Sequence, residues 1–421
     1  MLKALTADSP FTVVTVAGTN GKGSTVAMLE AIFTAAGYKT GSYTSPHLIH
    51  YNERIKINQK PVSDELICQA FERIDRARDD ISLTYFEFGT LAAIDIFHRC
   101  ECEIVILEVG LGGRLDAVNV IDPDVALITT VDIDHQDWLG SDRNTIALEK
   151  AGIYRQNKPA IYGDINLPET IRDKVLEEGL DFYQFSQDYG VERQHNNEQW
   201  NWLLLKQNQA KHYNLPLPQL KGSIQLKNAA NVMMVLELLK HSHPVSLAEI
   251  KRGLHNTFLA GRFQVVSTRP LIILDVAHNE QAAENLRHSV EQLALPGKGS
   301  GGKVHVIVGM LKDKEVSKVL AIIEPIAASW RIIELDSPRA MPANEIKQIL
   351  SQQIYTSVAK NKNIKCFDDF EQAYQDFARY NSNTEMIETL LIFGSFFTVS
   401  DALQSLSPES EQTANLTRSL G

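Results

Sequence analysis

The chain has 421 residues, which is more than one ordinary hydrophobic core holds, so two domains are expected. It is 44% hydrophobic and 22% charged with a formal net charge of −11, which argues against binding to nucleic acid or to an anionic membrane surface. No apolar run is long enough to span a membrane, and four cysteines do not make a disulfide framework in a chain of this size, so we expect a cytoplasmic protein.

Apolar, β-branched runs alternate with amphipathic stretches in the first part of the chain, the pattern of buried parallel strands joined by helices. Strands are predicted at 11–17, 103–109, 124–130 and 158–163. A segment richer in strand residues is predicted at 181–206. Helices are predicted at 24–36, 63–78, 86–99, 144–152, 225–240 and 246–256.

The alternation restarts near residues 259–266, which we take as the domain boundary. Further strands are predicted at 271–277, 303–309, 330–335 and 389–394. The two series together predict an α/β fold with right-handed crossovers. Residues 1–260 are expected to form a doubly wound, mostly parallel sheet with a phosphate loop, and residues 261–421 a smaller Rossmann-like α/β domain.

The letters "GKGS" occur twice, at 21–24 and at 297–300, and only the first copy has the context of a phosphate loop. It lies between the strand at 11–17 and an amphipathic helix, whose free N–H groups can face an anion. Lys22 can then reach the terminal phosphates, and the Ser24 hydroxyl can ligate Mg²⁺. The second copy follows a helix and precedes a strand, so it predicts a surface loop without chemistry.

The motif "LEVGLGGRLDAVN" (107–119) places a carboxylate, Glu108, at the end of a very apolar strand. The same edge of a parallel sheet would carry the phosphate loop. A buried carboxylate needs a partner, and a metal ion is a good one, although an ordinary buried acid is the alternative. The glycines that follow permit a tight loop that presents Arg114 and Asp116.

Two histidine motifs are ambiguous from their pattern alone. "TSPHLIHYNERIKI" (44–57) contains His47, which in isolation is better interpreted as a loop histidine on an exposed segment. "TTVDIDHQDWLG" (129–140) brings three aspartates and His135 to the end of a strand. A ligand site and a helix cap with solvated acids are both open there.

Two further motifs are similarly open. "ALEKAGIYR" (147–155) places Lys150 beside Glu149, which from pattern alone favours a solvated surface pair. "LDVAHNEQAAENL" (274–286) places Asp275 at a strand end and Asn279 near a helix start. This loop could bind a nucleotide, or it could be an ordinary helix cap.

Taken together, the motifs closely resemble folylpolyglutamate synthase/dihydrofolate synthase, the folate branch of the Mur ligase superfamily. The matching segments are "VAGTNGKGS", "TSPHL..YNERI.I", "YFEFGTLAA", "LEVGLGGRLDA.N", "DHQDWLG", "EKAGI", "Q..NAA", "GRFQ" and "LDVAHN". They run in family order over residues 11 to 397. The resemblance overrules the surface interpretations of His47 and Lys150.

The resemblance implies an ATP-dependent ligase that adds L-glutamate to 7,8-dihydropteroate and to reduced folates through an acyl phosphate. It implies a monomer. It implies Mg²⁺ ligands at Ser24, Glu108 and His135. It implies catalytic roles for Lys22, His135 and Lys150, with Lys150 modified to a carbamate. The implied ATP-binding residues are Asn20, Gly21, Lys22, Gly23, Ser24, Thr25, Asn228, Arg262, Asp275 and His278. The implied pterin- and folate-binding residues are Ser45, Thr84, Tyr85, Phe86, Glu87, Leu115, Asp116 and Ala117.

The sequence departs from the family pattern at its start. The family carries a longer segment before the phosphate-loop strand, which helps to bind dihydropteroate, whereas this sequence opens with "MLKALTADSPF". If the segment is absent, the dihydropteroate reaction is the activity we expect to suffer most. Ala260 and Glu280 stand where prolines are usual, and we expect both to be tolerated. The alternatives are a ligase for a UDP-sugar peptide and a nucleotide-binding paralogue without ligase activity.

Overall fold

The computed structural model describes residues 11–134, 136–140, 142–193, 199–205, 214–222, 224–294, 303–356, 362–384 and 388–406. The second "GKGS" and His135 lie outside the described residues. The chain forms two compact units. Unit 1 comprises Met1–Leu220 and Ile224–Leu259, and unit 2 comprises Lys221–Ser223 and Ala260–Gly421.

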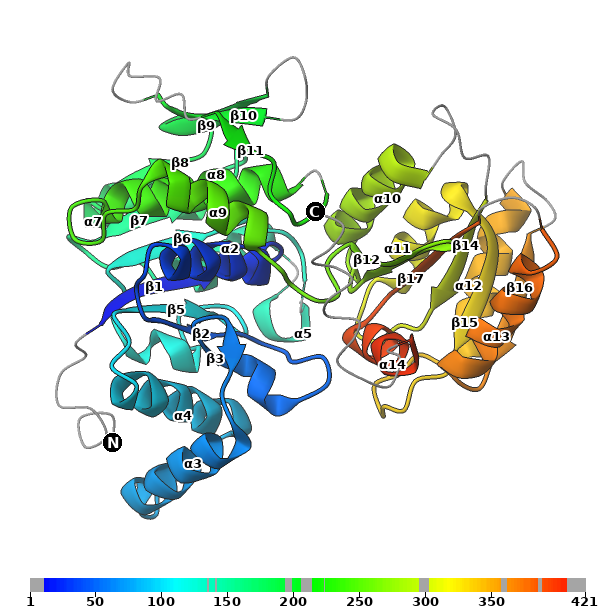
Figure 1. Ribbon diagram of the computed structural model, residues 1–421, viewed down its shortest axis with the longest axis horizontal. Coiled ribbons are helices and arrows are strands. Elements are labelled where there is room, and N and C mark those ends of the chain that lie inside the picture. The colour runs from blue at the N-terminus through cyan, green and yellow to red at the C-terminus, as the bar shows by residue number, and fades with distance from the viewer. Residues whose placement is uncertain are drawn as a thin grey trace. The chain divides into compact units, whose positions relative to one another are not determined.

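Unit 1 is built on an eight-stranded sheet in the order β4-β3-β2-β5-β1-β6-β7-β8 (Figure 1). Its strands are β1 (Thr12–Ala17), β2 (Thr40–Tyr43), β3 (Ile55–Ile57), β4 (Lys60–Pro61), β5 (Ile104–Glu108), β6 (Val125–Ile128), β7 (Pro159–Tyr162) and β8 (Asp181–Gln184). From β2 to β8 neighbouring strands pair in parallel, whereas β3 and β4 add an antiparallel edge. The continuous apolar runs suit a sheet that is covered on both faces.

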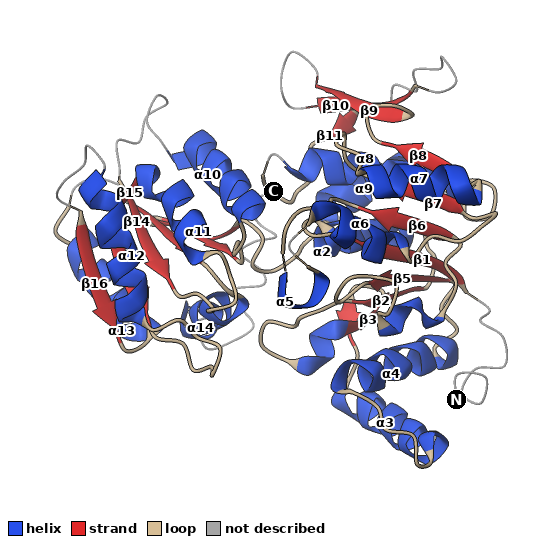
Figure 2. Ribbon diagram, turned by 180° about the vertical axis from the view of Figure 1, so that it is seen from behind, coloured by secondary structure: helices blue, strands red, loops and turns tan. Residues whose placement is uncertain are grey.

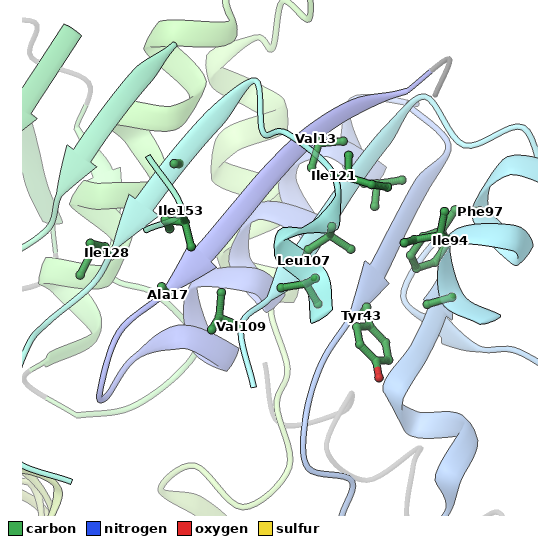
Figure 3. Close-up of a cluster of buried hydrophobic side chains, with 14 of the residues drawn as sticks. Val13, Ala17, Tyr43, Ile94, Phe97, Leu107, Val109, Ile121, Ile128 and Ile153 are labelled. Carbon is green, nitrogen blue, oxygen red and sulfur yellow. The ribbon is translucent and has the colours of Figure 1, made fainter. Parts of the chain in front are cut away.

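Helices cover both faces of this sheet (Figure 2). They are α2 (Lys22–Ala35), α3 (Asp64–Arg78), α4 (Tyr85–Arg99), α5 (Gln136–Leu139), α6 (Arg143–Ala151), α7 (Glu169–Glu178), α8 (Ile224–Leu239) and α9 (Leu247–Asn256). Alternate residues of β1 point into the two core layers, because successive side chains of a strand face opposite sides. Val13 and Ala17 pack with Leu107 and with Ile94 of α4 (Figure 3), whereas Val14 packs toward α2, α8 and α9.

A small antiparallel sheet extends unit 1. It consists of β9 (Tyr189–Arg193), β10 (Gln199–Leu204) and β11 (Leu215–Pro216). Trp200 and Trp202 of β10 are fully buried in the same cluster as α8, and the Trp202 indole N–H donates to the Ala230 carbonyl at 3.1 Å. These contacts join the small sheet to the helical layer on one side of the main sheet.

Helix α9 packs against α2 at Gly253, and we predict that Gly253→Ala destabilises the protein. An added Cβ would lie 2.5 Å from the Cα and Cγ1 atoms of Ile32. Helix propensity favours alanine by about 1 kcal/mol, but overpacking two helices costs about 1–3 kcal/mol, so a net loss is expected. Thermal and denaturant unfolding measure it. Gly190→Ala is the control, because its nearest neighbouring atom would be 3.9 Å away. Equal stability of the two variants would contradict this packing argument.

Unit 2 is a six-stranded sheet in the order β12-β13-β17-β14-β15-β16. Its strands are β12 (Gln264–Thr268), β13 (Leu271–Asp275), β14 (Val304–Val308), β15 (Ala327–Ile333), β16 (Asn363–Phe367) and β17 (Thr389–Phe393). Only the β12–β13 pairing is antiparallel within the described part of this sheet. Its helices are α10 (Glu280–Ala294), α11 (Val316–Ile323), α12 (Ala343–Thr356), α13 (Phe370–Asn381) and α14 (Phe396–Leu406). The predicted α/β fold with mostly parallel sheets is confirmed.

The helices offer no candidate for a membrane span. None within the described ranges is both long enough and apolar enough to cross a bilayer.

Candidate active site

The loop between β1 and α2 has the backbone shape of a phosphate loop. Gly18 and Gly21 have φ angles of +146° and +89°, which L side chains rarely adopt. An added Cβ at Gly18 would lie 1.9 Å from Thr129 Oγ1, and one at Gly21 would lie 2.7 Å from Asn228 Oδ1. The loop is therefore confined between the end of β6 and helix α8, and only glycine fits at these two positions.

Hydrogen bonds from the segment after β6 hold the loop in place. The Thr129 hydroxyl donates to the Asn20 carbonyl at 2.6 Å, and the Asn20 N–H donates to Thr130 Oγ1 at 3.1 Å. The Thr19 N–H donates to the Thr130 carbonyl at 2.9 Å. The first turn of α2 consequently presents its backbone N–H groups at a fixed position, where an anion would be stabilised.

Lys22 and Ser24 take up the positions that phosphate and metal binding require. The Lys22 ammonium lies over the loop and donates to the carbonyls of Gly18, at 2.9 Å, and Thr19, at 3.3 Å. Ser24 is buried, and its hydroxyl accepts a hydrogen bond from Gln225 Nε2 of α8 at 3.3 Å. Both residues lie in the N-terminal turn of α2, beside the loop that would hold the phosphates.

Glu108 ends β5 beside this turn. Its register partner on β1 is Val16, and only 5% of its surface is exposed. The Ser45 N–H donates to its Oε2 at 3.2 Å, and a Cβ at Gly23 would be 3.8 Å from both carboxylate oxygens. A buried carboxylate and the Ser24 hydroxyl are hard oxygen donors of the kind that Mg²⁺ prefers, so they fit the predicted metal.

The described residues include two of the three predicted metal ligands, Ser24 and Glu108. Across the described residues, no group of three or more His, Cys, Asp or Glu residues could hold a metal ion. The predicted set contains two such residues, Glu108 and His135, together with the Ser24 hydroxyl, and His135 lies outside the described residues. The backbone contact between Ser45 and Glu108 additionally brings Ser45 to this carboxylate, whereas the sequence had suggested a folate contact for it.

The glycine loop after β5 packs tightly against its surroundings. A Cβ at Gly110 would be 2.7 Å from the Phe86 ring, and one at Gly113 would be 2.9 Å from the carbonyl oxygens of Glu149 and Lys150. Asp116 holds the loop by accepting hydrogen bonds from the N–H groups of Leu111, at 2.9 Å, and Val118, at 3.0 Å. Burial raises the pKa of Asp116, although these hydrogen bonds oppose the shift.

Lys150 points into a pocket that it shares with the phosphate loop. The pocket has a volume of about 310 Å³, and its lining includes Lys22, the glycine loop, Asp134, Leu139 and Lys150. Lys150 is 5% exposed, whereas Glu149 next to it forms an ion pair with Arg114 at 2.9 Å. The surface pair that the pattern alone favoured is therefore wrong, because only Glu149 faces outward.

The environment of Lys150 suits a chemically reactive amine. Burial and, second to it, the nearby Lys22 charge lower its pKa to about 7, against the opposing charges of Asp134 and Asp116. About half of the amine is thus uncharged near pH 7. Only an uncharged amine can add CO₂ to become a carbamate, and the resulting negative charge would face the Lys22 ammonium. The predicted carbamate stays a prediction.

Comparison with known proteins agrees with this geometry. The family description "Mur ligase middle domain" matches residues 16–237, and "Mur ligase, glutamate ligase domain" matches residues 261–396. The chain is 41% identical to the "Dihydrofolate synthase/folylpolyglutamate synthase" of Escherichia coli over 396 residues, which are 94% of this chain and 86% of that protein. The chain belongs to the dihydrofolate synthase/folylpolyglutamate synthase family of Mur ligases.

Solved structures of the same family have the same fold. Escherichia coli FolC in complex with DHPP and ADP matches with a TM-score of 0.85 and 39% identity, over 96% of this chain and 90% of that one. A bifunctional folylpolyglutamate synthase/dihydrofolate synthase with Mn, AMPPNP and L-glutamate bound matches with a TM-score of 0.83 and 38% identity, over 96% and 93%. Divalent metal, nucleotide and glutamate are therefore ligands of those relatives.

The residues that the family resemblance assigns to pterin binding have different surroundings. Thr84 and Glu87 form a capping box at the start of α4, with the Thr84 N–H donating to Glu87 Oε2 at 2.7 Å. Tyr85 and Leu115 are 63% and 78% exposed, so their apolar surface is available to a ligand. Phe86 packs against Tyr43, with ring centroids 5.7 Å apart. Ala117 begins a short 3₁₀ helix and is half-buried.

The assigned ATP-binding residues of the Mur glutamate ligase domain gather at the end of β13. The Asp275 carboxylate accepts hydrogen bonds from the N–H groups of Phe263, at 2.7 Å, and Ala277, at 2.8 Å. Burial raises its pKa, and the Arg262 charge opposes this. His278 Nδ1 lies 2.7 Å from the Val276 carbonyl oxygen. Asn279 accepts from the Ala282 N–H at 2.9 Å, which agrees with the helix-cap interpretation of that motif.

In unit 1, Asn228 and Thr25 complete the surroundings of the phosphate loop. Asn228 is fully buried, and its side-chain amide donates to Gln225 at 3.1 Å. Its Oδ1 has no hydrogen-bond partner within the described part of the chain and abuts Gly21. The Thr25 hydroxyl donates a hydrogen bond to the Gly21 carbonyl at 2.8 Å. The sequence pattern does not indicate that Thr129 and Thr130 hold the phosphate loop by hydrogen bonds, although both residues lie in the motif at 129–140.

Proposed function

We propose that this chain is an ATP-dependent ligase that adds L-glutamate to 7,8-dihydropteroate and to tetrahydrofolate polyglutamates. The observation that carries the proposal is the pocket in which Lys22 of the phosphate loop faces the buried, weakly basic Lys150. The comparisons support the same activity, because the Escherichia coli relative carries both synthase names and the match covers 86% of its length.

The chemistry begins with the acceptor carboxylate. One carboxylate oxygen attacks the γ-phosphorus of ATP, the bond to ADP breaks, and an acyl phosphate forms. The N–H groups at the start of α2 and the Lys22 ammonium stabilise the charge on the γ-phosphoryl oxygens during this transfer. The amine of L-glutamate then attacks the acyl carbon, phosphate leaves, and the nitrogen loses a proton as the amide forms.

Ser24, Glu108 and His135 would hold Mg²⁺, which supplies charge neutralisation for the phosphates when it is bound. Lys150 as a carbamate would add a negative charge next to Lys22. Asn20, Asn228, Arg262, Asp275 and His278 are proposed nucleotide contacts, and Tyr85, Phe86 and Leu115 are proposed acceptor contacts. We further propose a cytoplasmic monomer.

Phosphate release by the purified chain tests this function. The chain is incubated with Mg²⁺, ATP and L-glutamate, and with dihydropteroate, tetrahydrofolate or a UDP-sugar peptide as the acceptor. We expect phosphate release that depends on either pterin acceptor, with products one glutamate heavier by mass spectrometry. Release with the UDP-sugar peptide alone would favour the cell-wall alternative. No release with either pterin acceptor would defeat the proposal.

A further inference from the structure

A buried arginine outside the phosphate pocket has no acidic partner among the residues that the structure describes. Arg54 ends the 3₁₀ helix Tyr51–Arg54 and is only 8% exposed. No carboxylate of a described residue lies within ion-pair distance of it, in contrast to Arg73 of α3, which is paired with Asp95. An arginine that is more than nine-tenths buried without a counter-ion is costly, so a bound anion would stabilise it.

The surroundings of Arg54 fix its orientation. Its Nε donates to His47 Nδ1 at 2.8 Å, and its guanidinium carbon lies 5.5 Å from the ring centroids of both Tyr51 and Tyr85. Burial and the Arg54 charge lower the pKa of His47, which keeps that imidazole neutral and able to accept. The Tyr43 hydroxyl is a polar neighbour of the guanidinium, and its side-chain hydrogen bond with Arg54 opposes the rise that burial causes in the Tyr43 pKa. This neutral neighbour does not balance the charge, so the guanidinium can still pair with an anionic ligand.

The one carboxylate next to Arg54 in the sequence is already engaged. Glu53 accepts hydrogen bonds from the N–H groups of Leu48 and Ile49, both at 2.8 Å, and of His50, at 2.7 Å. Burial opposes its ionisation, but these bonds still lower the pKa of Glu53. The Glu53 carboxylate therefore stabilises the preceding turn through these backbone hydrogen bonds, and it is not the counter-ion of Arg54.

The position of Arg54 identifies the molecule that would reach it. Tyr85, which stacks on the guanidinium, opens α4 and belongs to the proposed acceptor surface. Arg54 does not line the pocket of Lys22 and Lys150, where the reacting carboxylate must meet the γ-phosphate. We propose that Arg54 binds the second carboxylate of a folate acceptor, the one on its glutamyl residue that is not phosphorylated. The inference rests on the proposed function.

This assignment separates the two acceptors, because dihydropteroate has a single carboxylate and folates have more. A charge-assisted pair between a guanidinium and a carboxylate contributes enough to change an affinity roughly 10- to 100-fold. Arg54 then favours folates over dihydropteroate, and His47 acts as a positioning residue that orients the guanidinium fork.

Steady-state kinetics of Arg54→Gln with both acceptors tests the proposal. We expect the ratio of KM for tetrahydrofolate to KM for dihydropteroate to rise at least tenfold, with kcat much less affected. Arg54→Lys keeps the charge but loses the planar fork, so its ratio should fall between those of wild type and Arg54→Gln. The control Arg73→Gln removes another arginine of unit 1, one that is already paired with Asp95, and its ratio should equal that of wild type.

A second measurement changes the acceptor, and its first part needs only the wild-type chain. On the wild-type chain, tetrahydrofolate with its α-carboxylate converted to an amide should show a KM at least tenfold above that of tetrahydrofolate. In Arg54→Gln the KM values for the amide and for tetrahydrofolate should differ by less than threefold, because the guanidinium that pairs with the carboxylate is absent. An unchanged KM ratio in Arg54→Gln, or an amide that binds wild type as well as the acid, would overturn the proposal. A wild-type chain inactive with both acceptors would instead overturn the function itself.

Discussion

Lys150→Ala is expected to lower kcat by about 10²- to 10³-fold, the usual size of the loss when one side chain that supports charge stabilisation in the transition state is removed. The amine lies in the pocket with Lys22, and burial lowers its pKa to about 7. As a carbamate it would balance the Lys22 charge, and alanine would leave that charge uncompensated. Added formate or acetate should restore part of the activity by occupying the space that the side chain leaves.

The control for this variant is Lys158→Ala, a lysine of the same unit whose side chain is 43% exposed and paired with Asp124. It should retain nearly full activity, because surface pairs contribute little. Mass spectrometry of the native protein should detect one added CO₂ on Lys150. Full activity of Lys150→Ala without added acid would show that no anion is needed at this position.

The lowered pKa of Lys150 also predicts the direction of a pH effect. The uncharged form predominates above about pH 7, where the amine can add CO₂, and the ammonium predominates below it. Activity should therefore fall as the pH drops below 7, and removal of bicarbonate should deepen the loss. In Lys150→Ala rescued by acetate, the bicarbonate dependence should disappear.

Glu108→Gln is expected to lower kcat/KM by roughly 10²- to 10⁴-fold, because a metal ion supplies several kcal/mol of transition-state stabilisation. The amide has nearly the shape of the carboxylate, and its oxygen can still accept from the Ser45 N–H, so the fold should persist. The loss should accompany a higher Mg²⁺ concentration for half-maximal activity, measured by titration.

Glu149→Gln is the matched control for this second variant. Glu149 is also an acid beside the glycine loop, but it pairs with Arg114 and faces outward. Its replacement should change neither the Mg²⁺ requirement nor kcat/KM by more than a few-fold. The metal assignment would fail if the two variants had the same Mg²⁺ dependence.

Local patterns predicted the sheet and the phosphate loop well, because strand runs and loop glycines act through nearby residues. The start of α2 was placed at Ser24, whereas the helix begins at Lys22, since Gly21 in a left-handed conformation caps it without a side chain. The start of α4 was placed at Phe86, although Thr84 and Glu87 form the capping box that begins it.

Burial was not predictable from these patterns. Lys150 is adjacent to a surface acid in the sequence, and it is buried because the turns around Gly113 and Gly152 bring α6 against the glycine loop. The surroundings of Arg54 combine His47 and Tyr51 of its own motif with Tyr85 of α4, which is distant in the sequence. Family likeness corrected the interpretation of Lys150, whereas only the three-dimensional arrangement drew attention to Arg54.

The loop between β1 and α2 is held by side chains on both of its flanks, Thr129 and Thr130 on one and Asn228 on the other. Its conformational entropy is therefore lost when the chain folds and not when a ligand arrives. Nucleotide binding should consequently proceed at a rate set by diffusion and orientation. In each turnover ATP can replace ADP without a rearrangement of this loop.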